Sequence, residues 1–109
     1  MTEIGKNAFA NCQNLKTIEL PSSLIEIGST AFTGCSSLES IIIPDSVKSV
    51  GDNAFLRCVK LREATFSGDE LTIGTQIFES CDNVKVMARK NTSAHKYALE
   101  NNYKFVELK

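Results

Sequence analysis

Neither sign of charge prevails in this 109-residue sequence, because 12 Lys and Arg residues stand against 13 Asp and Glu residues, for a formal net charge of −1. The charges are scattered along the whole length, so no cationic face favours phosphate backbones or anionic lipid. Apolar runs are short, and none approaches the ~20 residues that a membrane-spanning helix needs. The first residues also lack the charged-then-apolar layout of a secretory signal. We expect no nucleic-acid partner and no insertion into a membrane.

The sequence also has little that points to catalysis. Its one histidine, His95, belongs to no motif with a Cys or Ser partner, so we interpret it as a surface or packing residue. No two carboxylates are held at a spacing that suggests glycosidase or metal chemistry, and no glycine-rich phosphate-binding pattern occurs. We predict that the chain is not an enzyme and has no cofactor, no catalytic residue and no metal site.

Four cysteines lie one repeat period apart, at Cys12, Cys35, Cys58 and Cys81. The close cysteine pairs typical of zinc sites are absent. Stacked coils would place equivalent residues about 4.8 Å apart, which allows a disulfide by Cα distance. Parallel side chains would, however, keep the Cβ atoms farther apart than the roughly 3.8 Å that a disulfide prefers. We expect buried, reduced thiols that fill space, with a disulfide as the alternative.

The sequence does contain a 23-residue period. Four units, 4–26, 27–49, 50–72 and 73–95, align without an insertion or a deletion. Each unit repeats an aliphatic residue before a glycine, then a phenylalanine, a cysteine and two further apolar positions, while the residues between them vary. A recurring apolar set with variable neighbours is typical of stacked coils, in which each unit buries its apolar residues against the next.

Within a unit, LKTIELP (15–21) and LESIIIP (38–44) alternate apolar and polar residues and stop at a proline, which predicts one short strand per coil. Leu15, Ile18 and Leu20 would face inward, and the strands would form a parallel sheet on one face. A second extended piece leads to the repeat glycine, where we expect either a positive-φ corner or close approach of neighbouring backbone. The AFxxC stretch would close the turn, with phenylalanine filling the interior.

The period weakens toward the C-terminus. In the third unit Ala64 replaces a large aliphatic residue, and Phe66 is the candidate to refill the space. We expect repeats over 1–92 and a cap over 93–109, with a short helix in SAHKYALENN that has Ala94, Tyr97 and Ala98 on one face and follows an N-cap at Thr92 or Ser93. Phe105, with Val106 or Leu108, would close the last coil.

At these residues the chain resembles the BspA-like leucine-rich-repeat family, whose units follow a pattern like IGxxAFxxCxxLxxIxIPxSVxx. Residues 27–49 match this pattern almost throughout, and the resemblance covers roughly 4–90. It implies a repeat solenoid, a right-handed leucine-rich-repeat coil with a parallel β-sheet on one face. Family members are largely extracellular or surface-anchored bacterial proteins, several of them associated with adhesion, so the resemblance also implies an extracellular or cell-surface location.

We expect a binding site on the exposed face of the sheet, since a solenoid offers that face as an extended platform. Exposed apolar positions suggest contact with a partner, although β-branched residues also suit a sheet for ordinary reasons. The outward positions predicted from the alternation are Thr17, Glu19, Ser40, Ile42, Glu63, Thr65, Val86 and Ala88.

Two functions remain open at this point. One is a non-catalytic protein–protein interaction module, the C-terminal part of a larger surface or secreted adhesin-like protein that binds a host or matrix protein. The alternative is a structural spacer or end module without a ligand, which stacks on further repeats or self-associates. Residues 1–3 enter the repeat midway through a coil, so the alternative would act through an open first coil at Ile4 and Phe9.

Overall fold

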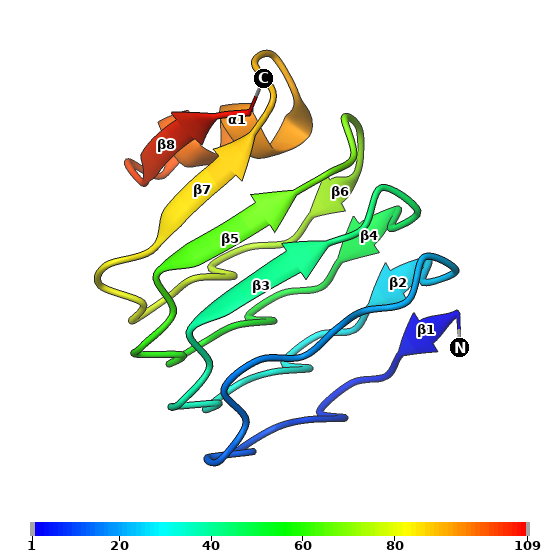
Figure 1. Cartoon of the computed structure of the whole chain (residues 1–109), viewed down its shortest axis with the longest axis vertical. Coiled ribbons are helices and arrows are strands. Elements are labelled where there is room, and N and C mark those ends of the chain that lie inside the picture. The colour runs from blue at the N-terminus through cyan, green and yellow to red at the C-terminus, as the bar shows by residue number, and fades with distance from the viewer. Residues whose placement is uncertain (1, 109) are drawn as a thin grey trace.

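The chain winds into a parallel-strand solenoid of about five turns, stacked one on the next from the N-terminal to the C-terminal end (Figure 1). The computed structural model describes residues 2–108. The two end residues of the predicted repeats and cap, Met1 and Lys109, lie outside the described residues. The predicted fold class is confirmed.

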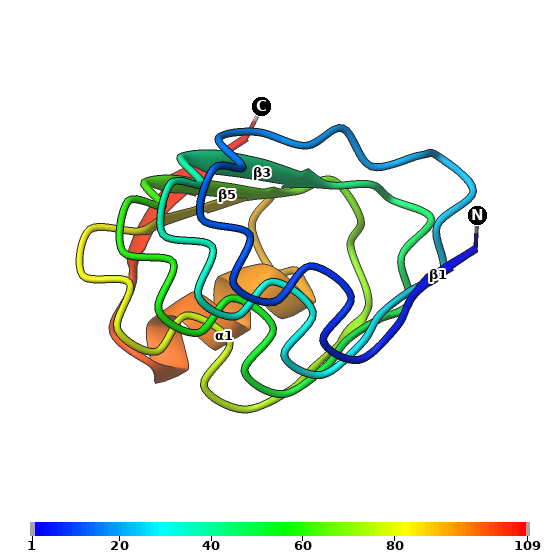
Figure 2. The same ribbon diagram turned by 90° about the horizontal axis from the view of Figure 1, so that it is seen from below.

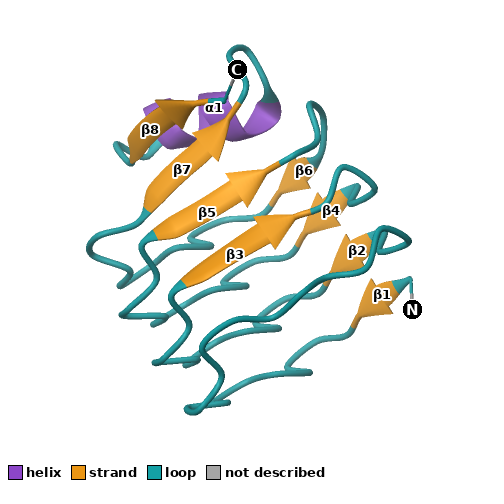
Figure 3. Ribbon diagram, viewed as in Figure 1, coloured by secondary structure: helices purple, strands orange, loops and turns teal. Residues whose placement is uncertain are grey.

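Two parallel four-stranded sheets run along the stack (Figure 3). The first consists of β3 (Ser40–Ile43), β5 (Glu63–Phe66), β7 (Lys85–Ala88) and β8 (Lys104–Glu107). The second consists of β1 (Glu3–Ile4), β2 (Glu26–Ile27), β4 (Ser49–Val50) and β6 (Thr72–Ile73), each just before or at the aliphatic residue of the repeat. Both predicted extended pieces therefore occur in the coil, and turns between them carry the AFxxC segments.

Stacked phenylalanines fill the interior between the two sheets. Phe9 and Phe32 have ring centroids 5.2 Å apart, and the spacing to Phe55 is 5.3 Å. Phe78 continues the stack at 5.7 Å. Phe66 is 1% exposed and meets Phe78 edge-on at 6.4 Å, so it packs in the same core as the small Ala64. Such offset aromatic pairs add to the stability gained from burial.

The repeat glycine is a point of close approach between coils and not a positive-φ corner. A Cβ at Gly51 would lie 2.7 Å from the carbonyl carbon of Gly28, which is closer than real Cβ atoms come. Left-handed backbone occurs two residues after the repeat glycine, where the side chains are mostly polar. These left-handed positions are Asn7, Thr30, Asn53 and Gln76.

A helix closes the C-terminal end of the core. α1 (Ser93–Glu100) begins at the N-cap Thr92, whose hydroxyl oxygen accepts a hydrogen bond from the His95 amide, and it buries Ala94 and Ala98. Seen from below, α1 lies across the interior of the coil outline (Figure 2). His95 has a packing role, since its ring stacks on Phe105 at 4.1 Å and its Nδ1 accepts the Asn91 amide.

Two details of the repeat differ from the prediction. Residues 15–20 form no strand. They run beside β3, but among the described residues a single backbone hydrogen bond, from the Glu39 amide to the Lys16 carbonyl, joins them to the segment that leads into β3. The fourth unit does contain a deletion: Lys85 pairs with Glu63, an offset of 22 (85 − 63) where the units before it have 23. Val84 and Val86 are both buried two positions apart, so the alternation of the strand overrides the repeat spacing.

Candidate binding surface

The outward face of the first sheet carries two rows of side chains that cross its strands. Because side chains alternate between the two faces of a strand, residues in register on neighbouring strands share a row. The row that we call the charged row contains Ser40, Glu63, Lys85 and Lys104. The next row, called the apolar row, contains Ile42, Thr65, Met87 and Val106.

Six of the eight predicted site residues lie on the outer side of the coil. Four of them fall in the two rows, and all four are exposed or half-exposed: Ser40, Ile42, Glu63 and Thr65. Thr17 and Glu19 are exposed on the first coil beside β3, although that segment is not a strand.

The prediction for Val86 and Ala88 is wrong, since both side chains are fully buried. The deletion before β7 moves every side chain of that strand to the opposite face, because the side-chain period of a strand is two. Lys85 and Met87 take the outward places instead. Met87, which follows the buried Ala64 by one 23-residue period and would therefore be expected inside, belongs to the outer face.

The apolar row exposes hydrocarbon on an ordered sheet. Ile42 is 61% exposed and Val106 is 38% exposed, while Thr65 and Met87 between them are half-buried. The Thr65 hydroxyl donates to the Met87 sulfur at 3.8 Å, so the two side chains in the middle of the row are in direct contact. Removing such a row from water is favourable, so it offers an apolar centre for a contact.

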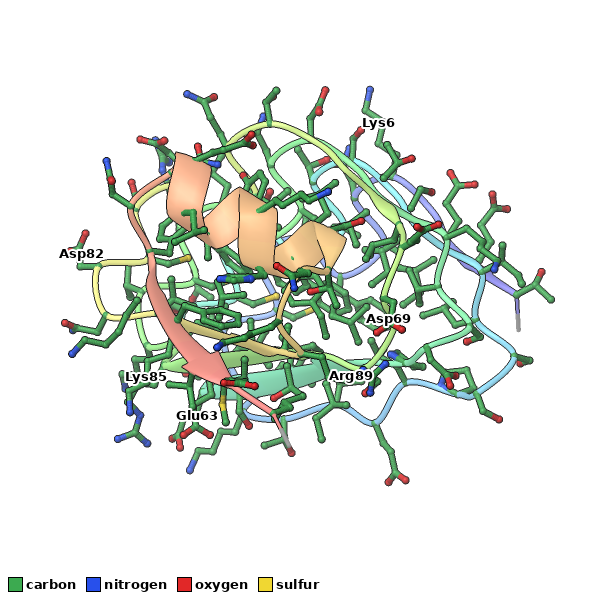
Figure 4. All side chains as sticks on the ribbon, turned by 90° about the horizontal axis from the view of Figure 1, so that it is seen from above. Lys6, Glu63, Asp69, Asp82, Lys85 and Arg89 are labelled. Carbon is green, nitrogen blue, oxygen red and sulfur yellow. The ribbon has the colours of Figure 1, made fainter. Side chains whose placement is uncertain are left out.

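Charged side chains border the apolar row at both ends of the strands (Figure 4). At the start of the strands, Arg62 pairs with Glu39 at 3.4 Å, whereas Glu63 and Lys85 form no ion pair with any described residue. At the other end, the Arg89 guanidinium lies 2.6 Å from Asp69. An apolar centre with a polar border is the usual layout of a protein–protein contact.

A hollow of ≈ 470 Å³ adjoins this face between the first coil and β3. Thr17, Glu19 and Ile42 are among the residues that line it. The hollow extends the outward face toward the N-terminal coil.

The four cysteines are free thiols; Cys35, Cys58 and Cys81 are buried as predicted, whereas Cys12 on the first coil is only half-buried. Cys35 donates to the Phe9 carbonyl at 3.0 Å, and Cys58 donates to the Phe32 carbonyl at 3.1 Å. Burial raises the pKa of the Cys35 thiol. The pKa of the Cys58 thiol is raised mainly by its hydrogen bond with the Cys81 thiol and also by burial. Such thiols are poor nucleophiles at neutral pH.

Among residues 2–108, no group of three or more His, Cys, Asp or Glu side chains is placed to hold a metal ion. No helix in the described part of the chain is long and apolar enough to cross a membrane.

The first coil is less open than the sequence suggested. Ile4 is only 3% exposed, so it is not available as a contact residue, because its side chain packs in the core beside Ile27. Phe9 and Leu15 remain half-buried at that end of the stack.

Four outward residues escaped the sequence prediction: Lys85, Met87, Lys104 and Val106. A partial signal is that Lys85 and Lys104 each stand between two apolar residues; Met87 and Val106 are themselves apolar, so alternation alone does not place them on the outer face.

Comparison with known proteins agrees with this architecture. A family model described as "BspA type Leucine rich repeat region" matches residues 1–108 in six copies. The crystal structure of a leucine-rich repeat protein from Bacteroides ovatus is similar over 99% of this chain, with a TM-score of 0.82 and 31% identity. The chain spans 28% of the length of that protein. No curated protein matches the chain.

Proposed function

Since the chain belongs to the BspA-type leucine-rich-repeat family, we propose that it is a non-catalytic interaction module that binds a protein through the outward face of β3, β5, β7 and β8. The observation that carries this proposal is the apolar row, and above all the exposure of Ile42. Its hydrocarbon lies at one end of the apolar row, on an ordered face whose charged borders resemble those of other protein contacts.

We further propose that the natural setting is a larger surface or secreted adhesin-like protein, of which this chain forms the C-terminal part, with a host or matrix protein as partner. The family resemblance supports this setting. The cap supports it too, since α1 and β8 cover one end of the core while the first coil leaves Phe9 half-buried at the other.

Protein capture with a matched pair of variants tests the proposed surface. Ile42→Lys places a charge in the apolar row, whereas Ile25→Lys changes an isoleucine that is 44% exposed outside that sheet. Immobilised wild type and variants are incubated with matrix and surface proteins, and bound proteins are identified by mass spectrometry. We expect a bound protein that is lost with Ile42→Lys and kept with Ile25→Lys.

Circular dichroism of both variants checks that they remain folded. Binding that survives Ile42→Lys but is lost with Ile25→Lys would assign recognition to another face and contradict the proposal.

The half-buried end of the stack favours one other function, a structural end module that stacks on further coils. Phe9→Asp would then abolish association of the chain while Ile42→Lys leaves it unchanged.

A further inference from the structure

The two rows of the outward face complement themselves under a two-fold rotation. An axis parallel to the strands and passing between β5 and β7 reverses the strand order, so that β3 faces β8 and β5 faces β7 of a second copy. Glu63 of each copy then lies opposite Lys85 of the other. In the apolar row, Ile42 lies opposite Val106 and Thr65 opposite Met87.

We propose that this face binds a second copy of the same chain in a two-fold dimer, with the axis between β5 and β7. The inference rests on the proposed function, because it adds a second copy of the chain to the partners of the same surface. Every contact occurs twice in such an isologous interface, so two Glu63–Lys85 pairs form at once.

Glu63 and Lys85, which would pair across the axis, form no ion pair with a described residue; Lys104 of the same row is also unpaired, and it would lie opposite Ser40. Arg62 and Arg89 have their own carboxylates, at 3.4 and 2.6 Å. Glu63 and Lys85 have none among the described residues, and both project from the outer side of the sheet (Figure 4). Their opposite charges are therefore available to a second copy.

The same charges select the direction of the axis. A two-fold axis along the stack and through the charged row would set Glu63 against Glu63 and Lys85 against Lys85, which repel each other. The axis parallel to the strands sets unlike charges against each other. It also keeps the apolar row facing the apolar row, with two sheets stacked about 10 Å apart as in β-sandwiches.

The size of the face limits the strength of the dimer. Four strands at about 4.8 Å spacing span roughly 14 Å across the stack, which is small for a stable interface, so we expect a weak dimer. Its mass should therefore be followed to chain concentrations of about 1 mM, where even a weak complex forms.

Sedimentation equilibrium of the full chain over a concentration series tests the dimer. The mass of the wild type should rise from 12.0 kDa toward twice that value. Glu63→Lys alone and Lys85→Glu alone should each stay monomeric, since each sets like charges across the axis. An equimolar mixture of the two variants should dimerise again, because two positive charges of one copy then face two negative charges of the other.

Glu26→Lys and Lys48→Glu, at exposed positions on and beside the second sheet, are the matched controls and should leave the mass curve unchanged. A wild type that stays monomeric throughout would overturn the dimer. So would dimers that persist in both single variants, or a mixture that stays monomeric. In each case the capture experiment with Ile42→Lys still decides the proposed function independently.

Discussion

At the scale of single residues, the repeat glycine and the repeat cysteine join neighbouring coils. Gly51 lets its backbone touch that of Gly28, and the Cys58 thiol donates to the Phe32 carbonyl 26 residues before it. The Phe32 carbonyl also accepts the Cys35 amide at 3.2 Å, so the thiol uses its second lone pair, and the buried sulfhydryl of Cys58 gains an acceptor. The period could be read from the sequence, but the reason why glycine and cysteine recur at these two positions of the repeat appears only when the coils stack.

Replacing the repeat glycine tests the close approach. Gly51→Ala should lower the free energy of unfolding by about 1–3 kcal/mol, because the added methyl group meets the backbone of the preceding coil. Gly5→Ala is the matched control, since a Cβ there meets nothing within 4 Å, and its effect should stay within about 0.5 kcal/mol. Urea denaturation measures both. Equal losses at the two positions would rule out backbone contact as the cause.

Thiol labelling of the native chain should distinguish one cysteine from the other three. Cys12, half-buried on the first coil, should react promptly with a thiol reagent near neutral pH. Cys35, Cys58 and Cys81 are at most 4% exposed, so they should react only as the chain unfolds. Mass spectrometry of the labelled peptides identifies the site. Prompt labelling of Cys58 would mean that the coils do not stack as described.

At the scale of elements, the sequence predicted the coil, both extended pieces, the turn and the capping helix, because each has a strong local pattern. It missed the register of β7. The 23-residue period predicted that Met87 faces inward. In the structure Val84, Val86 and Ala88 are buried instead, because burying these three apolar side chains stabilises the fold more than keeping the 23-residue period would. It also assigned a strand to residues 15–20, but a strand needs ladder hydrogen bonds, and the first coil has too few to β3.

The cap should make stability fall at alkaline pH. Burial raises the pKa of Tyr103 from its ordinary 10.0 to about 12, so the folded state favours the neutral phenol. The stability that the neutral phenol contributes to the folded state is fully present below pH 10 and is lost as the pH rises to about 12. Urea denaturation across this range should show a steeper fall for the wild type than for Tyr103→Phe. Burial also raises the pKa of Tyr97, so some decline should remain in the variant. Identical slopes would contradict the raised pKa of the half-buried phenol at position 103.

At the scale of the whole molecule, the sequence identified the outward face of the sheet but only some of the residues that lie on it. Alternation alone identified Ile42 and Thr65. The apolar row with Met87 and Val106, and the charged row with Lys85, depend on the register between strands far apart in the sequence. Local patterns do not encode that register when one unit is a residue short, so the complementarity of the face emerges only from the assembled sheet.

Methyl NMR tests most directly whether the outward sheet face is the contact surface. The labelled chain is observed while a protein that it binds, its own second copy included, is added in steps. The account predicts that the methyl signals of Ile42 and Met87 shift first, while those of Ile25 and Ile4 stay unchanged. Shifts at Leu15 and Ile18 of the first coil, with Ile42 unaffected, would contradict the account and assign the contact to the end of the stack.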